Sequence, residues 1–214
     1  MDLCLSCKAC KSECPSSVDV AKLKAEFLQQ YYDKDGIPLR SRAIAYLPRL
    51  NRLASLAPPV SNFFMTNRFF SKVLKGFLGM SQKRHLPKLH KTTVYRYVKN
   101  LKMEQGTEGK VYLFNDEFTN FNDTPIGIKT IQLLSKLGYE VVIPKHREST
   151  RTFISKGLLR TAKKIANENI KLLQDVVSKD TPLIGIEPSA ILTFRDEYPE
   201  LVDRHLVEGS QHIA

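Results

Sequence analysis

Apolar residues recur at helical spacing through the first half of the chain. Positions 20, 23, 27 and 31 predict a helix over 18–32, capped by Ser16 or Ser17, with one face packed against another element. A looser pattern over 39–56 is interrupted by Pro48 and ended by Pro58. A third run over 63–78 predicts one amphipathic basic helix with an unusually aromatic apolar face, whose apolar stripe is ordinarily buried but also suits a membrane surface or a partner.

The second half alternates strands with helices. Short apolar runs predict strands over 110–115, 139–144 and 183–187, and helical periodicity predicts helices over 125–137 and 158–178. Strands that alternate with helices of ten or more residues favour βαβ units and a parallel sheet. A change in composition at 105–109 indicates a linker before this part.

All four cysteines of the 214-residue chain lie within eleven positions, as Cys4, Cys7, Cys10 and Cys14, followed by Pro15. The spacing C-x2-C-x2-C-x3-C-P is that of a bacterial-type ferredoxin loop that holds [4Fe–4S] clusters. In two-cluster proteins the fourth cysteine of such a run ligates the other cluster. We therefore expect the first three cysteines to share one cluster and Cys14 to belong to a neighbouring one.

Two other interpretations of the cysteines stay open. Structural zinc normally uses two C-x2-C pairs separated by a dozen or more residues, which this chain lacks. Two disulfides within eleven residues would not staple a domain of this size, and no other cysteine is present to cross-link. An iron–sulfur site is the favoured prediction, and such a site implies a reducing compartment. No signal peptide is visible in the sequence, so the cytoplasm is the expected location.

Charge is distributed unevenly. The chain carries a formal net charge of +11, yet residues 36–103 contain fourteen Lys and Arg and no Asp or Glu. The remainder is slightly acidic. The basic stretch 36–103 predicts salt-sensitive association with an acidic partner or an anionic membrane surface. No recognition motif accompanies it, so nucleic acid is not expected as a partner.

The expected fold is α+β or α/β. A short ferredoxin-like all-α module over 1–35 precedes a basic helical connector over 36–107 and a partial Rossmann-like parallel βαβ domain over 108–214. No G-x-G-x-x-G or P-loop sequence occurs, so neither a flavin nor a nucleotide is expected on this chain through such a loop. No apolar stretch is long enough to predict a transmembrane helix.

Polar residues follow each predicted strand. His146 and Glu148 follow the second strand and Glu187 ends the third, where α/β folds bind ligands, and Asn115, Asp116 and Glu117 follow the first. Ordinary loop and capping roles explain them at least as well. The run Ser149-Thr150-Arg151 precedes a helix and suits either an anion or simple capping.

The chain resembles the C-terminal part of the FAD-linked oxidases, a family that includes D-lactate, glycolate and D-2-hydroxyglutarate dehydrogenase-like proteins. The stretches that carry the resemblance are 3–15, 19–27, 51–58, 114–120, 138–142, 155–158 and 187–197. In that family a flavin domain precedes a ferredoxin-type region and a cysteine-rich domain of two similar halves named for its Cys-Cys-Gly motif. The resemblance implies that this chain supplies the ferredoxin-type region and the first half of the cysteine-rich domain.

The chain departs from this family at three points. A further cysteine motif upstream is absent, only about one half of the cysteine-rich domain is present, and residues 146–151 replace Cys-Cys-Gly. Ala190 also stands where some relatives carry cysteine. No second metal centre is therefore expected in the α/β part. A fragment, a truncated product and a separate subunit are all compatible with the sequence.

The resulting functional prediction is an iron–sulfur electron-transfer subunit or region of a flavin-dependent 2-hydroxy-acid dehydrogenase, not catalytic alone. FAD would lie on a partner domain or subunit, and electrons would move toward an acceptor such as quinone, either in the cytoplasm or peripherally at the inner face of the membrane. The alternative is a non-redox adaptor in which the cysteines bind zinc and the basic helices dock a membrane surface or an acidic partner.

Overall fold

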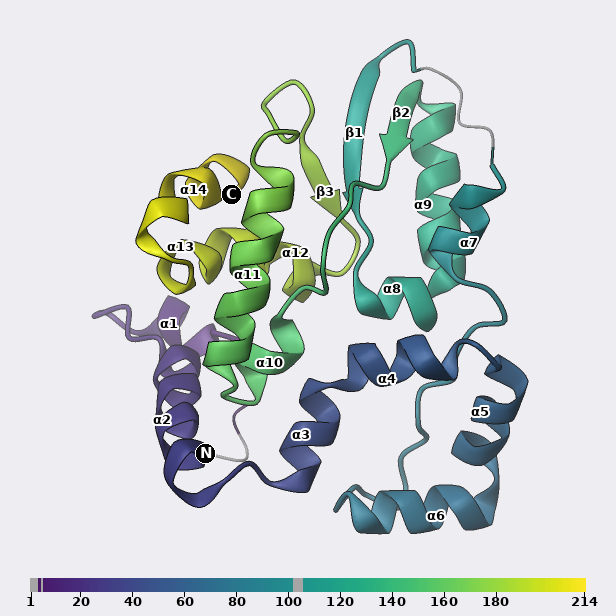
Figure 1. The fold of residues 1–214 in the computed structure, drawn as a ribbon, viewed down its shortest axis with the longest axis vertical. Coiled ribbons are helices and arrows are strands. Elements are labelled where there is room, and N and C mark those ends of the chain that lie inside the picture. Colours follow the sequence, from purple (N-terminus) through teal and green to yellow (C-terminus); the bar gives the residue numbers. More distant parts are fainter. Residues whose placement is uncertain (1–3, 5, 102–105) are drawn as a thin grey trace.

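A three-stranded parallel sheet lies at the centre of the second half of the chain (Figure 1). The computed structural model describes residue 4, residues 6–101 and residues 106–214. The strand order is β2–β1–β3, with bounds β1 Gly109–Phe114, β2 Tyr139–Val142 and β3 Leu183–Gly185. The parallel sheet is confirmed, although β2 and β3 end two residues earlier than predicted. The finer Rossmann-like assignment stays a prediction.

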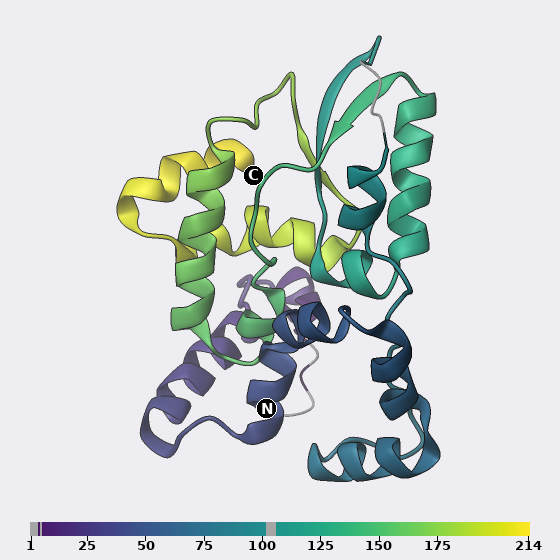
Figure 2. The same cartoon turned by 45° about the vertical axis from the view of Figure 1, so that its right-hand side comes forward.

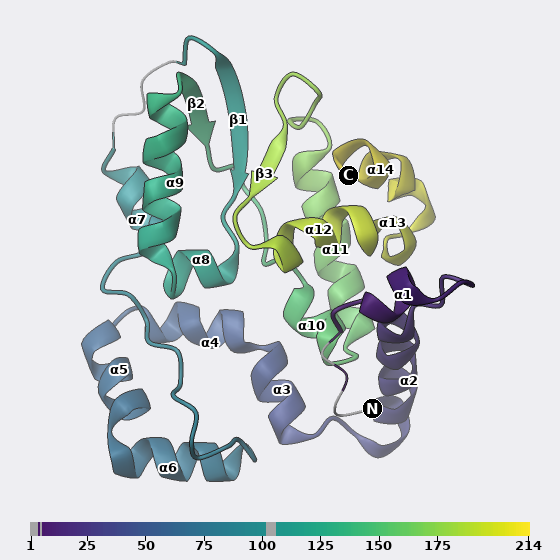
Figure 3. The same ribbon diagram turned by 180° about the vertical axis from the view of Figure 1, so that it is seen from behind.

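Helices cover both faces of the sheet, as the turned views show (Figures 2 and 3). On one side lie α7 Val94–Lys99 and α9 Thr124–Lys136, with the short α8 Glu117–Phe121 below them. On the other lie α11 Leu159–Leu173, α12 Pro188–Asp196, α13 Tyr198–Leu201, the 3-10 turn Arg204–Leu206 and α14 Val207–Ile213. The helix α10 Arg151–Ser155 connects β2 to α11.

Strand β1 divides the core between these two helical layers. Val111 and Leu113 pack with Val94 and Ile131 on the α7–α9 side. Phe114 joins the apolar residues of α11 to α14 on the other side. Successive side chains of a strand point to opposite faces, so a strand buried on both faces reads as the continuous apolar run that this sequence shows.

The first half of the chain is helical and wraps below the sheet (Figure 1). Its helices are α1 Ala9–Glu13, α2 Val20–Asp35, α3 Leu39–Ala45, α4 Leu47–Ala54, α5 Pro58–Thr66 and α6 Arg68–Phe77. Helix α2 packs on α10 and α11, α3 on α10, and α4 on α8. The predicted linker at 105–109 begins at Gln105, which lies outside the described residues.

Two sequence predictions about these helices are wrong in detail. The aromatic run does not form one helix, because Asn67 has extended backbone between α5 and α6, and its side chain caps α6 by accepting from the N–H groups of Phe69 and Phe70. The cap of α2 is Asp19, which accepts from the Lys22 N–H at 3.0 Å, and not Ser16 or Ser17. Several adjacent polar side chains can each cap the first N–H groups of a helix, and the one that does so sets where the helix begins.

The predicted packing face of α2 is also left uncovered by the described residues. Its apolar stripe of Val20, Leu23, Phe27 and Tyr31 is exposed, whereas Lys24 and Ala25 are the buried residues of the helix. No helix among the described residues is both long and apolar enough to cross a membrane.

Candidate functional site

The cysteine loop, residues 4–14, turns sharply between its thiols. Ser6 and Lys8 have positive φ angles of 56° and 63°, in the left-handed region that side-chain-bearing residues seldom adopt. Ser17, just after the loop, has φ 53°. Backbone strain of this kind costs about 1–3 kcal/mol per residue and is found chiefly at binding and catalytic sites.

The four sequence-predicted cysteines are all free thiols. Cys7 and Cys10 are exposed, and Cys4 and Cys14 are partly buried. Among residues 4, 6–101 and 106–214, no three His, Cys, Asp or Glu side chains are gathered closely enough to hold a metal ion. The structure therefore brings the thiols onto one short loop without arranging them around a common centre.

Backbone groups around Cys14 favour its ionised form. Hydrogen bonds from the backbone of Val18 and Ser16 lower the pKa of the Cys14 thiol. Burial opposes them with a smaller effect, and a weaker backbone hydrogen bond from Ser17 acts in the same direction as the first two. The thiolate is the form of cysteine that binds metals. Four free thiols at this spacing, one of them held toward the thiolate, are a donor set that fits an iron–sulfur cluster.

Cationic side chains fasten the cysteine loop to the rest of the chain. The buried Lys24 of α2 donates to the Cys4 carbonyl oxygen at 2.7 Å, and Arg151 of α10 donates to the Ser6 carbonyl oxygen at 2.7 Å. Arg151 also pairs with Glu197 at 3.1 Å, and Lys8 approaches the same carboxylate at 2.6 Å. Glu197 thus joins a residue of the loop to α10.

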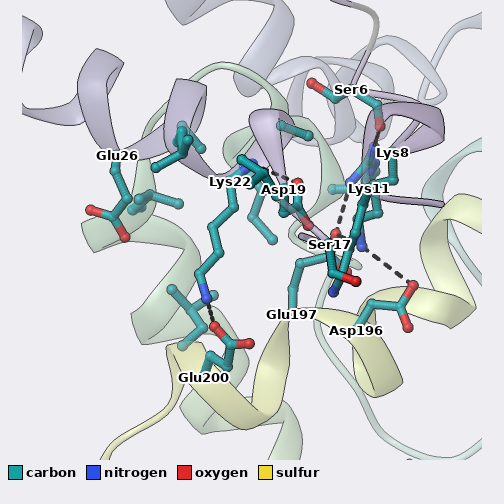
Figure 4. Close-up of a pocket in the computed structure, with 18 residues that line it drawn as sticks. Ser6, Lys8, Lys11, Ser17, Asp19, Lys22, Glu26, Asp196, Glu197 and Glu200 are labelled. Carbon is teal, nitrogen blue, oxygen red and sulfur yellow. Dashed lines mark hydrogen bonds and ion pairs between the residues drawn. The ribbon is translucent and has the colours of Figure 1, made fainter. Parts of the chain in front are cut away.

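The fastened loop borders a cavity of about 470 Å³. The loop and α2 form one wall, and α10, α12 and α13 form the other (Figure 4). Ion pairs of Lys8 with Asp196 and of Lys22 with Glu200 span it, while Leu23, Ile154 and Leu201 contribute apolar surface. Sequence reasoning missed Lys24, Arg151 and Glu197 in this role, because no local pattern pairs residues so far apart along the chain.

The polar residues after the strands have structural partners instead. Asp116 caps α8, Glu187 caps α12, and Glu148 pairs with Arg49 at 3.0 Å. The side chain of Ser149 accepts from the Arg151 N–H, while Thr150 makes no capping bond. These contacts agree with the capping interpretation.

His146 lies at the same edge of the sheet. Its Nδ1 donates to the Arg147 carbonyl oxygen at 2.7 Å, so Nε2 is the acceptor for Tyr95 Oη at 3.0 Å and the Asn115 N–H at 3.3 Å. Burial lowers the pKa of His146, which favours the neutral ring. The structure places His146 near Glu148 but provides no shared metal site for them among the described residues.

Comparison with known proteins gives consistent matches. The chain is 29% identical over 214 residues to D-2-hydroxyglutarate dehydrogenase of Pantoea ananatis and 30% identical over 207 residues to that of Escherichia coli K12. These alignments cover 94% and 92% of this chain, but 21% and 20% of the relatives. The chain is similar to dehydrogenases. It spans about a fifth of the length of these relatives.

A shorter relative is also found. One of the subunits of the anaerobic glycerol-3-phosphate dehydrogenase of Escherichia coli K12 is 25% identical over 192 residues, which cover 88% of this chain and 48% of that protein. No protein-family model matches the sequence, and no solved structure matches the chain. The dehydrogenase part of the resemblance is thus supported, and the cysteine-rich domain assignment stays a prediction.

Proposed function

We propose that this chain is the iron–sulfur electron-transfer region of a flavin-dependent 2-hydroxy-acid dehydrogenase. The observation that carries the proposal is the cysteine loop, in which Cys4, Cys7, Cys10 and Cys14 have cluster-binding spacing on free thiols. The similarity to D-2-hydroxyglutarate dehydrogenases supports the enzyme class. A [4Fe–4S] cluster, when bound, supplies one-electron transfer between a reduced flavin and an acceptor such as quinone.

The contribution of this chain's residues is to hold the ligand loop and to set its electrostatic surroundings. Lys24 and Arg151 donate to the carbonyl oxygens of Cys4 and Ser6, which ties the backbone of the first ligand and of the residue before the second to α2 and α10. Lys8 stands between Cys7 and Cys10, but its charge is balanced by Asp196 and Glu197. Charges and hydrogen bonds around cluster ligands tune reduction potential.

The partner in this proposal is a flavin-binding dehydrogenase domain or subunit. The exposed stripe of Leu23, Phe27 and Tyr31 on α2 follows directly after the cysteine loop, so a domain seated there would approach the cluster ligands. The relatives are about five times longer than their aligned part, which leaves ample chain to cover this stripe. The proposal places the protein in the cytoplasm, a compartment that keeps thiols reduced.

Metal and sulfide analysis tests the proposal. The full chain is purified without oxygen, and iron, acid-labile sulfide and zinc are measured per chain together with the electron paramagnetic resonance spectrum after reduction. We expect iron and sulfide in about equal amounts and a cluster signal. The matched variants are Cys7→Ser, which should lose most of the iron, and Ser12→Ala, at an exposed position of α1 that should keep it.

Two results would overturn the assignment. One zinc per chain with no iron would establish the adaptor alternative. Unchanged iron content and spectrum in Cys7→Ser would show that the cysteine loop does not hold the metal.

A further inference from the structure

An exposed aromatic surface covers α5 and α6. We define the aromatic patch as Phe63, Phe64, Phe69, Phe70, Val73 and Phe77, whose exposed fractions run from 41% to 72%. The rings form a continuous group, with centroids 4.9 Å apart for Phe64 and Phe70 and 5.6 Å apart for Phe69 and Phe70. Val73 and Phe77 extend it along the same face of α6, because residues four apart are neighbours on a helix.

The polar side of α6 faces inward. Ser71 and Lys75 are the buried residues of this helix, the reverse of the usual arrangement in a water-exposed surface helix. Lys75 donates to the carbonyl oxygens of Gln82 and Arg84 at 3.0 and 3.1 Å. Asn62 of α5 makes two 2.8 Å hydrogen bonds with the backbone of Leu89. These bonds to the segment 79–93 hold the two helices with their aromatic side outward.

The two helices lie at a corner of the molecule, far from the sheet (Figures 1 and 3). Their main contacts are with each other, so the aromatic patch does not pack against the core of another described part of the chain. Patches of large exposed apolar side chains on a soluble domain ordinarily mark an interaction surface.

The charge around the aromatic patch favours an anionic partner. Arg68, Lys72, Lys83 and Arg84 are exposed on α6 and the segment that follows it. In the part of the chain that the structure describes, the ion pairs of residues 36–101 are limited to Arg49 with Glu148. A second copy of the chain would bring like charges together, which disfavours self-association through this face.

We propose that the aromatic patch binds the surface of an anionic lipid bilayer. The phenylalanine rings would enter the boundary between headgroups and acyl chains, while Arg68 and Lys72 contact lipid phosphates. The helices lie on the surface and do not cross it, in agreement with the lengths of α5 and α6. This inference does not depend on the cysteines or on the proposed electron transfer.

A single-tryptophan experiment tests the geometry directly, because the chain contains no tryptophan. Phe77→Trp places a reporter in the aromatic patch, and Leu133→Trp places one at an exposed apolar position of α9 as the control. With vesicles of phosphatidylglycerol and phosphatidylcholine, we expect Phe77→Trp to shift to shorter wavelength and to be quenched by brominated acyl chains. The Leu133→Trp fluorescence should stay unchanged, and pure phosphatidylcholine should bind at least about tenfold more weakly.

Vesicle sedimentation of the full chain provides the second measurement. Phe69→Ser with Phe77→Ser should weaken binding to phosphatidylglycerol vesicles by about a hundredfold, whereas Leu133→Ser with Leu137→Ser should not. Arg68→Gln with Lys72→Gln should reduce the binding and its salt dependence together.

Three outcomes would overturn the proposal. They are no binding to anionic vesicles, equal effects of the patch and control variants, and light scattering that shows a dimer dissolved by the patch variant. The iron content of the chain is independent of all three, so failure here is distinct from failure of the proposed function.

Discussion

At the residue scale, the carboxyl group of Glu117 is buried at the start of α8. It accepts hydrogen bonds from the backbone N–H and the hydroxyl of Ser149 at 3.0 and 2.8 Å. Burial nevertheless outweighs these bonds and the nearby negative charge of Asp116 adds to it, so that the pKa of Glu117 rises to about 7. The contribution of this carboxyl group to the stability of the fold therefore depends on whether it is protonated.

The raised pKa predicts a loss of stability as pH rises. Between the unfolded pKa of 4.5 and the folded pKa of about 7, native Glu117 keeps a proton that the unfolded chain has released. The free energy of unfolding should fall through this window by about 3 kcal/mol and then level off. Glu117→Gln, a neutral mimic of the protonated form, should remove this fall. Urea denaturation of the wild-type and Glu117→Gln proteins at pH 5 and pH 8 measures this free energy of unfolding. An equal fall with pH in both proteins would contradict its attribution to Glu117.

The link between the cysteine loop and α10 gives a second residue-scale prediction. Arg151→Met removes the donor to Ser6 and one partner of Glu197, where both charged side chains are only 16% exposed. Because Lys8 still pairs with Glu197, we expect a loss of about 2 kcal/mol in the free energy of unfolding, together with lower iron content. Arg195→Met, which breaks an exposed pair with Asp196, should leave the free energy of unfolding nearly unchanged and keep the iron. Equal effects would show that Arg151 has no special role.

At the element scale, close packing of α9 on α7 and α8 depends on a glycine. A Cβ added at Gly127 would lie 2.6 Å from a methyl of Val94 and 2.8 Å from that of Thr119. Gly127→Ala should therefore destabilise the fold by about 1–3 kcal/mol through overpacking. Gly76→Ala in α6 is the matched control, because its nearest neighbour is 3.8 Å away and alanine favours helix over glycine by about 1 kcal/mol. Thermal melts that rank the two variants in the opposite order would contradict this packing.

Local pattern was sufficient for most elements but not for their ends. The strands and α9 follow from apolar runs and helical periodicity, since these elements bury the residues that their patterns mark. The sequence does not predict the break at Asn67, because the apolar residues on its two sides continue one helical repeat. A side-chain cap that accepts two N–H groups outweighs the continuation of the pattern.

The candidate site is likewise only partly predictable from the sequence. The cysteine loop is recognisable from sequence because its ligands are local, whereas Lys24 lies twenty positions and Arg151 more than a hundred positions from the backbone groups they bind. The sequence also does not predict that the apolar faces of α2 and α6 are exposed. A pattern marks an apolar face but not whether other residues of the chain cover it. Only tertiary contacts decide that question.

At the scale of the whole molecule, the position of α2 on the α/β part depends on Gly157. This residue has φ +70° and lies against α2, where an added Cβ would meet the Cβ of Leu28 and come within 3.2 Å of the Ala25 carbonyl oxygen. The cysteine loop precedes α2, so this contact also helps to hold the loop where Lys8 pairs with Asp196 and Glu197. Helix α2 also packs directly on α10 and α11, and the domain boundary at residue 35 stays a prediction.

Substitution of two glycines separates this contact from backbone strain. Gly79→Ala, at φ +61° with nothing within 4 Å, should cost about 1 kcal/mol through left-handed strain alone. Gly157→Ala carries the same strain and also displaces α2, so it should cost about 3 kcal/mol and speed amide hydrogen exchange in residues 20–35. Exchange in β1 should stay slow, because the three-stranded sheet and its core clusters do not include α2. If both variants leave exchange in α2 equally slow, close packing at Gly157 does not hold the cysteine loop in place.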